Sequence, residues 1–311
     1  MIASQFQVNR LQAVRRNRKT ALKAILLAAT VIVASFVVAF FIIPHPSSLT
    51  LQNCVWLTPS SMGLELMNTP SLWESTVIRL ENANIHCIIV WAGWWNPDHT
   101  IQYADSPNVW KQFISTVKAT DPDFKVLALV GTDQGIDIST SANRTLMIKS
   151  VKQLLSSAPF SGWNDDLETF IGSNQDLIAY WQGVASMVKG MGLIATVDTG
   201  VGAWSYSIEE VYPYLTNFNY IIPMFYSTIA YSNAADYWNS ILSNSPVPVI
   251  MGLAIDPPAN GNLSMSQQLT WIDGQSHKNL AGFSIWVYDY WSDADFAAWN
   301  NWAINKTLGY A

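Results

Sequence analysis

Residues 160–168 read FSGWNDDLE, and they predict a β-strand that carries several polar side chains. Side chains alternate along a strand, so Asn164, Asp166 and Glu168 point the same way. If they point into a barrel, they stack along its axis and Glu168 reaches the mouth. Packed carboxylates raise one another's pKa, which suits a general acid at neutral pH. The alternative interpretation is a solvated acidic loop that follows a strand.

Short apolar runs like this one recur along the chain, with starts roughly 30 residues apart, the span of a βα unit. They are rich in Val, Ile and aromatic residues and do not alternate with polar residues, which is typical of parallel strands buried on both faces. The runs are Cys54–Leu57, His86–Trp91, Lys125–Val130, Gly162–Leu167, Leu193–Asp198, Tyr220–Tyr226, Val247–Leu253 and Gly282–Tyr288.

Helix-start signals follow most of these runs. Ser106 precedes Pro107, Ser173 precedes a helix expected over 175–189, and Ser292 precedes one expected over 293–305. Ser264 and Gln267 fit a capping box. Strands that alternate with helices predict an α/β fold, a (β/α)8 TIM barrel over residues 53–311. An open doubly wound sheet is the alternative, but no glycine-rich phosphate loop follows the first run.

The N-terminus predicts a membrane anchor. Residues 1–23 hold six cations and no acid, and residues 24–43 form a run of 20 without any charge. That length spans about 30 Å of hydrocarbon. The basic tail should stay cytoplasmic, which places the barrel outside the cell after a linker over 44–52. A cleaved signal peptide is the alternative, although its apolar core is usually shorter.

Charge and composition limit the possible partners. The chain has 16 basic and 22 acidic residues, so the part after residue 23 carries 10 and 22, a net charge of −12. Such a domain repels phosphate backbones, and we expect no nucleic-acid partner. The four histidines show no ligand spacing, so we expect no metal and no cofactor. Cys54 and Cys87 are either a disulfide or, as we favour, buried residues on neighbouring strands.

The active site of such a barrel lies at the C-terminal ends of its strands. Candidates lie at the end of the second, fifth, sixth, seventh and eighth runs or just after it, and they are Trp94, Trp95, Asp198, Met224, Tyr226, Asp256 and Trp286. Flat indole rings can stack on sugar rings, although most tryptophans only fill the core. We therefore expect a carbohydrate-binding site at the mouth.

Three segments resemble motifs of glycoside hydrolase family 18, the chitinases and endo-β-N-acetylglucosaminidases. The family's strand-four motif is D-x-x-D-x-D-x-E, and here Ser161 and Asn164 occupy its first two acidic positions while Asp166 and Glu168 match the last two. MFYS at 224–227 is similar to the family's Met-x-Tyr-Asp/Asn pattern, with Ser227 in place of the acid. Trp286 falls where the family has a tryptophan beneath the sugar.

The resemblance implies a substrate-assisted mechanism on β-linked N-acetylhexosamine glycans. Glu168 would protonate the glycosidic oxygen, and the substrate's own acetamido oxygen would attack the anomeric carbon. Asp166 would orient the acetamide, Tyr226 would donate a hydrogen bond to it, and Trp286 would stack below the sugar. Asn164 lacks the acid that would share a proton with Asp166.

Three other interpretations remain open. One is a glycosidase with two protein carboxylates, Glu168 and either Asp198 or Asp256. Another is a barrel that binds glycans without cleaving them, favoured by the two replaced acids. The third is a scaffold for protein contacts, which predicts no open cleft beside Glu168.

Overall fold

The structure, a computed structural model, describes residues 53–57, 66–131, 135–200, 208–256 and 259–306. The predicted tail, membrane helix and linker, residues 1–52, lie outside these ranges. Among the described residues, no helix combines the length and apolar character needed to cross a bilayer. The described residues belong to one compact unit, Leu49–Ala311.

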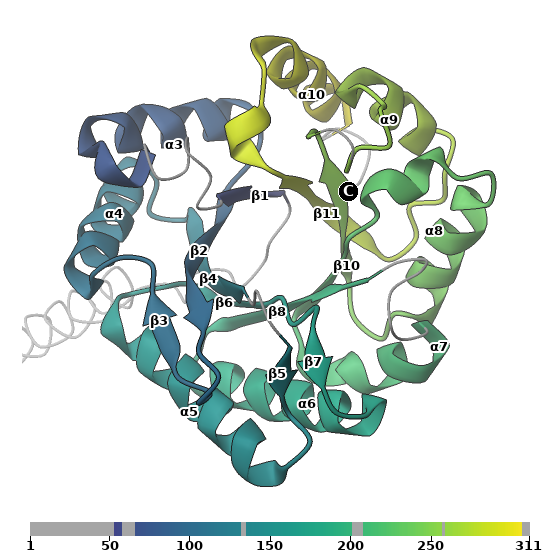
Figure 1. Ribbon diagram of the computed structural model, residues 1–311. Helices are drawn as coiled ribbons and strands as arrows, with labels where there is room; N and C mark the ends of the chain where they lie inside the picture. The colour runs from purple at the N-terminus through teal and green to yellow at the C-terminus, as the bar shows by residue number, and fades with distance from the viewer. Residues whose placement is uncertain (1–52, 58–65, 132–134, 201–207, 257–258, 307–311) are drawn as a thin grey trace, which may run out of the picture. The chain divides into compact units, whose positions relative to one another are not determined.

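Eight parallel strands form a closed barrel (Figure 1). Their hydrogen-bonded order is β1-β11-β10-β9-β8-β6-β4-β2, and β2 pairs back with β1 in register from Cys54–Cys87 to Leu57–Val90. Closure confirms the predicted barrel and rules out an open sheet. The strands are β1 (Cys54–Leu57), β2 (Cys87–Trp95), β4 (Lys125–Gly131), β6 (Gly162–Asp165), β8 (Ile194–Thr199), β9 (Tyr220–Pro223), β10 (Val249–Ala254) and β11 (Leu280–Trp286).

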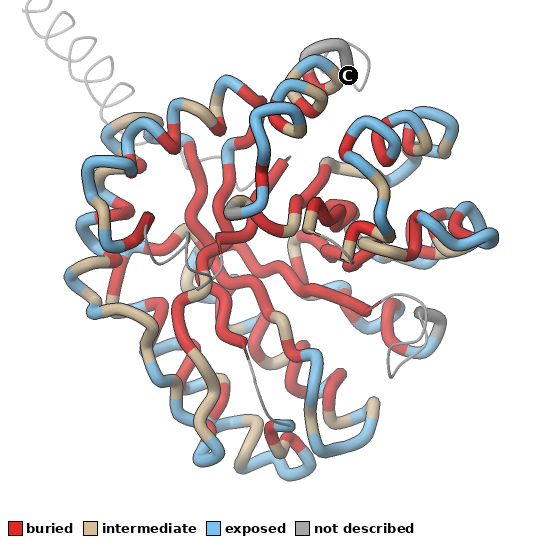
Figure 2. Tube along the Cα trace, turned by 45° about the horizontal axis from the view of Figure 1, so that its top comes forward, coloured by how far each residue is buried: buried red, intermediate tan, exposed pale blue. Residues whose placement is uncertain are grey.

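Helices surround the barrel, and their outward faces carry the exposed residues (Figure 2). Three of the predicted caps are present: Ser106 and Ser173 each accept a backbone N–H, and Ser264 forms a capping box with Gln267. Thr69, which precedes Pro70 and was expected to cap a helix in the same way, makes no side-chain cap bond. The helices are α3 (Trp73–Asn82), α4 (Pro107–Thr120), α5 (Ser141–Ser157), α6 (Asn174–Gly190), α7 (Ile208–Val211), α8 (Ala234–Asn244), α9 (Met265–Ile272) and α10 (Asp293–Lys306), with 3-10 turns η1 (Pro70–Leu72), η2 (Tyr212–Asn217), η3 (Tyr226–Ala230) and η4 (Tyr288–Tyr290).

The strands bury side chains on both faces, as their sequences predict. One cluster fills the inside of the barrel and includes Trp56, Ile89, Leu129 and Ile222. A larger cluster fills the space between strands and helices. Cys54 and Cys87 face each other across β1 and β2 as buried free thiols, which confirms that they are core residues.

Two small ribbons at the mouth were not predicted. The second strand continues to Trp95 and folds back as β3 (Ile101–Tyr103), which pairs with it antiparallel. β5 (Ile136–Asp137) pairs with β7 (Phe170–Ile171). The sixth strand is shorter than predicted, because it ends at Pro223 and Tyr226 opens η3.

Candidate active site

Within β6 the side chains alternate as predicted, with Asn164 inside the barrel, but the strand ends at Asp165, two residues earlier than predicted, so Asp166 and Glu168 lie beyond it. Its Nδ2 donates to Asp198 Oδ2 at 2.5 Å, and its Oδ1 accepts from Thr196 Oγ1 at 2.6 Å. Thr196 and Asp198 both lie on β8, and all three residues are buried. Asn164 therefore joins two neighbouring barrel strands at the base of the site.

Asp165 points the other way, into the layer between barrel and helices. Its carboxylate accepts from Trp163 Nε1 at 2.9 Å, Tyr180 OH at 2.8 Å and Trp181 Nε1 at 2.9 Å. Burial raises the pKa of Asp165, and these three hydrogen bonds lower it in part. Two of the donors belong to α6, so this contact fixes α6 to the strand that carries the site.

Asp166 and Glu168 lie where the chain leaves β6, and Glu168 is exposed. Burial raises the pKa of Asp166 well above its ordinary value, and the nearby Glu168 and Asp165 raise it further. Partial burial also raises the pKa of Glu168. An exposed, proton-retaining carboxyl at the mouth is what a general acid requires.

Three more of the predicted residues converge here. Burial raises the pKa of Tyr226, and Asp198, Asp166, Glu168 and Asp256 raise it further. Because such interactions weaken with distance, the four carboxyls lie near this phenol. One oxygen each of Asp166, Asp198 and Asp256 is shielded from water and has no hydrogen-bond partner among the described residues. The hydrogen-bonding capacity of these three oxygens is therefore unused among the described residues.

An aromatic group lies beside the carboxyls. The ring centroids of Trp56, Tyr226 and Trp286 are 6.0–6.3 Å apart in each pair. Trp286 is the last residue of β11, and its side chain forms a hydrogen bond with Asp256. Burial raises the pKa of Asp256, and the bond with Trp286 lowers it by a smaller amount. Trp56 was not predicted as a site residue, because its only signal is its inward position in β1. Met224 is buried in the barrel wall, bridged to Gly252 of β10.

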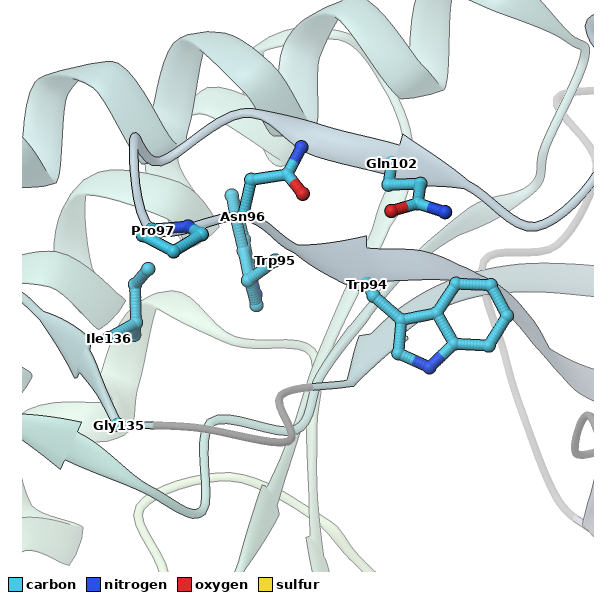
Figure 3. A pocket seen from close by; sticks show the side chains of 7 residues that line it. All are labelled: Trp94, Trp95, Asn96, Pro97, Gln102, Gly135 and Ile136. Atoms are coloured by element: carbon cyan, nitrogen blue, oxygen red, sulfur yellow. The ribbon is translucent and has the colours of Figure 1, made fainter.

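Trp94 and Trp95 instead line an open groove of about 430 Å³ at the mouth (Figure 3). The tip of the β2–β3 hairpin forms one side, and Gly135 and Ile136 form the other. Ile136 begins β5, which pairs with β7, and β7 starts only two residues after Glu168. The groove is thus linked through this ribbon to the segment that carries Glu168. The rings of Trp91 and Trp94 lie 6.4 Å apart, and Trp91 packs in the same interior cluster as Tyr226 and Trp286. Aromatic residues thus extend from the groove to the carboxyls.

One group in the described chain could hold a metal ion, although the sequence showed no such spacing. Ligand atoms of Glu81, His86 and Asp121 lie within 4.8 Å of one another. His86 and Asp121 precede β2 and β4, so the group lies at the end of the barrel opposite the carboxyls. The candidate active site itself consists of acids, amides and aromatic rings.

The raised carboxyl pKa values predict an unusual pH dependence of stability. Burial makes the carboxyls of Asp166 and Asp198 release their protons at a higher pH in the folded chain than in the unfolded chain, where they ionise near pH 4. The free energy of unfolding therefore falls as pH rises above about 4. We expect the double variant D166N/D198N to lose less stability than the wild type between pH 5 and 8. Thermal unfolding should show a difference of at least about 2 °C in the change of Tm. Equal changes in both proteins would contradict this assignment.

No family model matches the chain, and no curated protein is similar to it in sequence. Solved structures are similar in fold. A group IV chitinase from Ostrinia furnacalis in complex with allosamidin superposes with a TM-score of 0.57 at 14% identity, over 83% of this chain and 99% of that one. A chitinase from Chromobacterium violaceum gives 0.59 at 11% identity, over 82% and 99%.

A class V chitinase from Nicotiana tobaccum in complex with NAG4 gives a TM-score of 0.59 at 13% identity, over 81% of this chain and 98% of that one. At these identities the likeness concerns the fold alone. It confirms, at that level, the resemblance first drawn from three short motifs: the described domain is a TIM barrel of the kind found in family 18 chitinases.

Proposed function

We propose that the domain is a glycoside hydrolase acting on β-linked N-acetylhexosamine glycans. One observation carries the proposal: Glu168 is exposed at the mouth, beside Asp166 and the group of carboxyls around Tyr226. A groove lined by two tryptophans opens on the same end of the barrel and offers aromatic faces to a sugar chain. The complexes with allosamidin and NAG4 among the similar chitinases support a carbohydrate ligand.

The proposed reaction begins with Glu168 protonated, which its raised pKa favours. Glu168 gives its proton to the glycosidic oxygen while the substrate's acetamido oxygen attacks the anomeric carbon. Asp166 accepts the acetamide N–H and offsets the positive charge of the ring that forms. Tyr226 donates its O–H to the acetamide oxygen, and Trp286 stacks against the sugar. Water then opens the ring intermediate, and Glu168 takes back a proton as base.

A barrel that binds glycans without cleaving them is the second candidate. Asn164 cannot act as an acid, and the Ser161 hydroxyl accepts the backbone N–H of Val126 within the barrel wall. Both positions, acidic in the family motif, thus have structural partners here.

Hydrolysis of a labelled N-acetylglucosamine oligomer distinguishes the two candidates. We expect Glu168→Gln to lose ~100-fold or more in kcat because it removes the proton donor. Glu74→Gln, on the exposed surface of α3, is the matched control and should keep wild-type activity. If the wild type and Glu168→Gln bind the oligomer equally and neither cleaves it, the binding function is correct.

The groove lined by Trp94 and Trp95 lies apart from the carboxyls, and its volume of about 430 Å³ is in the range of small-molecule binding sites. It therefore supports a substrate longer than two sugars, with one part in the groove and another beside Glu168. We expect Trp94→Ala and Trp95→Ala to weaken binding of a long oligomer by about 10-fold, as loss of a stacking partner does, and to leave a disaccharide unaffected. Tyr214→Ala, an exposed aromatic on η2, is the control. Equal losses on both substrates would argue against the groove as a distal binding site.

We further propose that residues 24–43 anchor the barrel on the outer face of a membrane. Support comes from the uncharged run of 20 residues and the six cations before it. The full-length chain should remain in the membrane fraction after alkaline washing, whereas a chain that starts at residue 45 should not. If the protein expressed from the full-length sequence is instead recovered in the medium and lacks its N-terminus, a cleaved signal peptide is favoured.

A further inference from the structure

The connections that leave the barrel strands at the mouth carry charge of one sign. All ten lysines and arginines after residue 23 lie in helices, or at or just before the start of a strand. The described parts of the connections from a strand to the next helix instead carry acids, which include Asp98, Asp105, Asp137, Asp166, Glu168 and Asp256. A mouth lined by negative charge attracts ligands that carry positive charge.

Two of these acids adjoin the groove at the mouth (Figure 3). Asp98 follows the lining residue Pro97 at the tip of the β2–β3 hairpin, and Asp137 follows the lining residue Ile136 on the other side. His99 Nε2 donates to the backbone oxygen of Asp137 at 2.7 Å, and this bond joins the two sides of the groove. The fold therefore holds the two acids at a fixed separation, one on each side.

Hydrogen bonds favour the charged form of both carboxyls. Asp98 Oδ1 accepts from Thr100 Oγ1 at 2.6 Å and from its backbone N at 3.0 Å. Asp137 Oδ1 accepts in the same way from Ser139 Oγ at 2.6 Å and from its backbone N at 2.9 Å. The side-chain bonds from Thr100 and Ser139 contribute most to lowering the pKa of the two acids. Both acids thus differ from the carboxyls beside Tyr226, whose raised pKa values suit proton transfer.

Neighbouring basic side chains leave this negative charge uncompensated. Arg144, in the first turn of α5, donates to Asp176 at 2.6 Å and to the backbone oxygen of Ile138 at 2.7 Å. Among the described residues, neither Asp98 nor Asp137 takes part in an ion pair. A positively charged group of a ligand in the groove would therefore meet two carboxylates without displacing a protein cation.

We propose that the groove takes a sugar that carries a free amino group, so that the preferred substrate is a partly de-N-acetylated, cationic N-acetylhexosamine glycan. Cleavage of this glycan rests on the proposed hydrolase function, whereas its binding in the groove does not. An ammonium group is attracted by both carboxylates and by the indole faces of Trp94 and Trp95. A neutral acetamido group lacks this attraction, and it is needed only on the sugar beside Glu168, where it would act as the nucleophile.

Binding to full-length Glu168→Gln tests the proposal without cleavage. A partly de-N-acetylated N-acetylglucosamine oligomer is compared with the same preparation after re-acetylation of its amines, at about pH 5.5, where exposed carboxyls are charged and amines are protonated. We expect the amine form to bind about fivefold or more tightly at low salt, and high salt to remove this preference. Equal affinities, or a preference that salt does not weaken, would overturn the proposal.

The double variant D98N/D137N removes both charges and keeps the size of both side chains. It should bind the two forms of the oligomer within about twofold of each other, with unchanged affinity for the re-acetylated form. E74Q/D123N is the matched control, because it removes two exposed acids, one on α3 and one before β4, and it should keep the preference. If both double variants lose the preference equally, net charge alone is responsible and the assignment to the groove is wrong.

The products of cleavage separate this inference from the proposed function. Mass spectrometry of wild-type products from the partly de-N-acetylated oligomer should show free amines enriched at a fixed distance from the cleaved bond. Binding of the amine form through Asp98 and Asp137 without cleavage of either oligomer would support the groove and contradict the hydrolase. Cleavage with amines at random distances, unchanged in D98N/D137N, would support the hydrolase and overturn the inference.

Discussion

The alternation of side chains along β6 is the constraint on which the site depends. A shift of one residue would move Asn164 and Asp166 into the helix layer and bring Asp165 into the barrel. Three donors hold Asp165 on the outer side, at 2.8–2.9 Å. Each hydrogen bond to a charged group contributes about 1.5–3 kcal/mol, so the correct register is strongly favoured over the shifted one.

The same contact links the barrel wall to α6. Tyr180 and Trp181 reach Asp165 from the helix that follows the strand, and Ser173 and Asp176 fix the start of that helix with a capping box. Arg144 of α5 in turn binds Asp176 at 2.6 Å. The exit of β6, where Asp166 and Glu168 lie, is therefore held from two neighbouring helices.

The sequence was sufficient to predict the barrel strands, most of the caps and the alternation that separates Asn164 from Asp165, because these follow from local periodicity and cap chemistry. It could not predict the ribbons β2–β3 and β5–β7, since strands of two or three residues leave no periodic pattern. Nor could it pair Asn164 with Asp198 or group Trp56 with Trp286. Those contacts depend on barrel register and closure, which a linear pattern does not contain.

Closely placed acids oppose folding at neutral pH, and this cost argues for chemistry at the site. A site that only stacks sugar rings needs aromatic faces and amides, such as Trp94, Trp95 and Gln102 supply in the groove. It gains nothing from Asp166, Glu168 and Asp198, which raise one another's cost of ionisation. Proton transfer does require such groups, because a carboxyl must keep its proton near neutral pH to give it to a leaving oxygen. The arrangement of charge therefore favours a hydrolase over a binding barrel more strongly than the fold does.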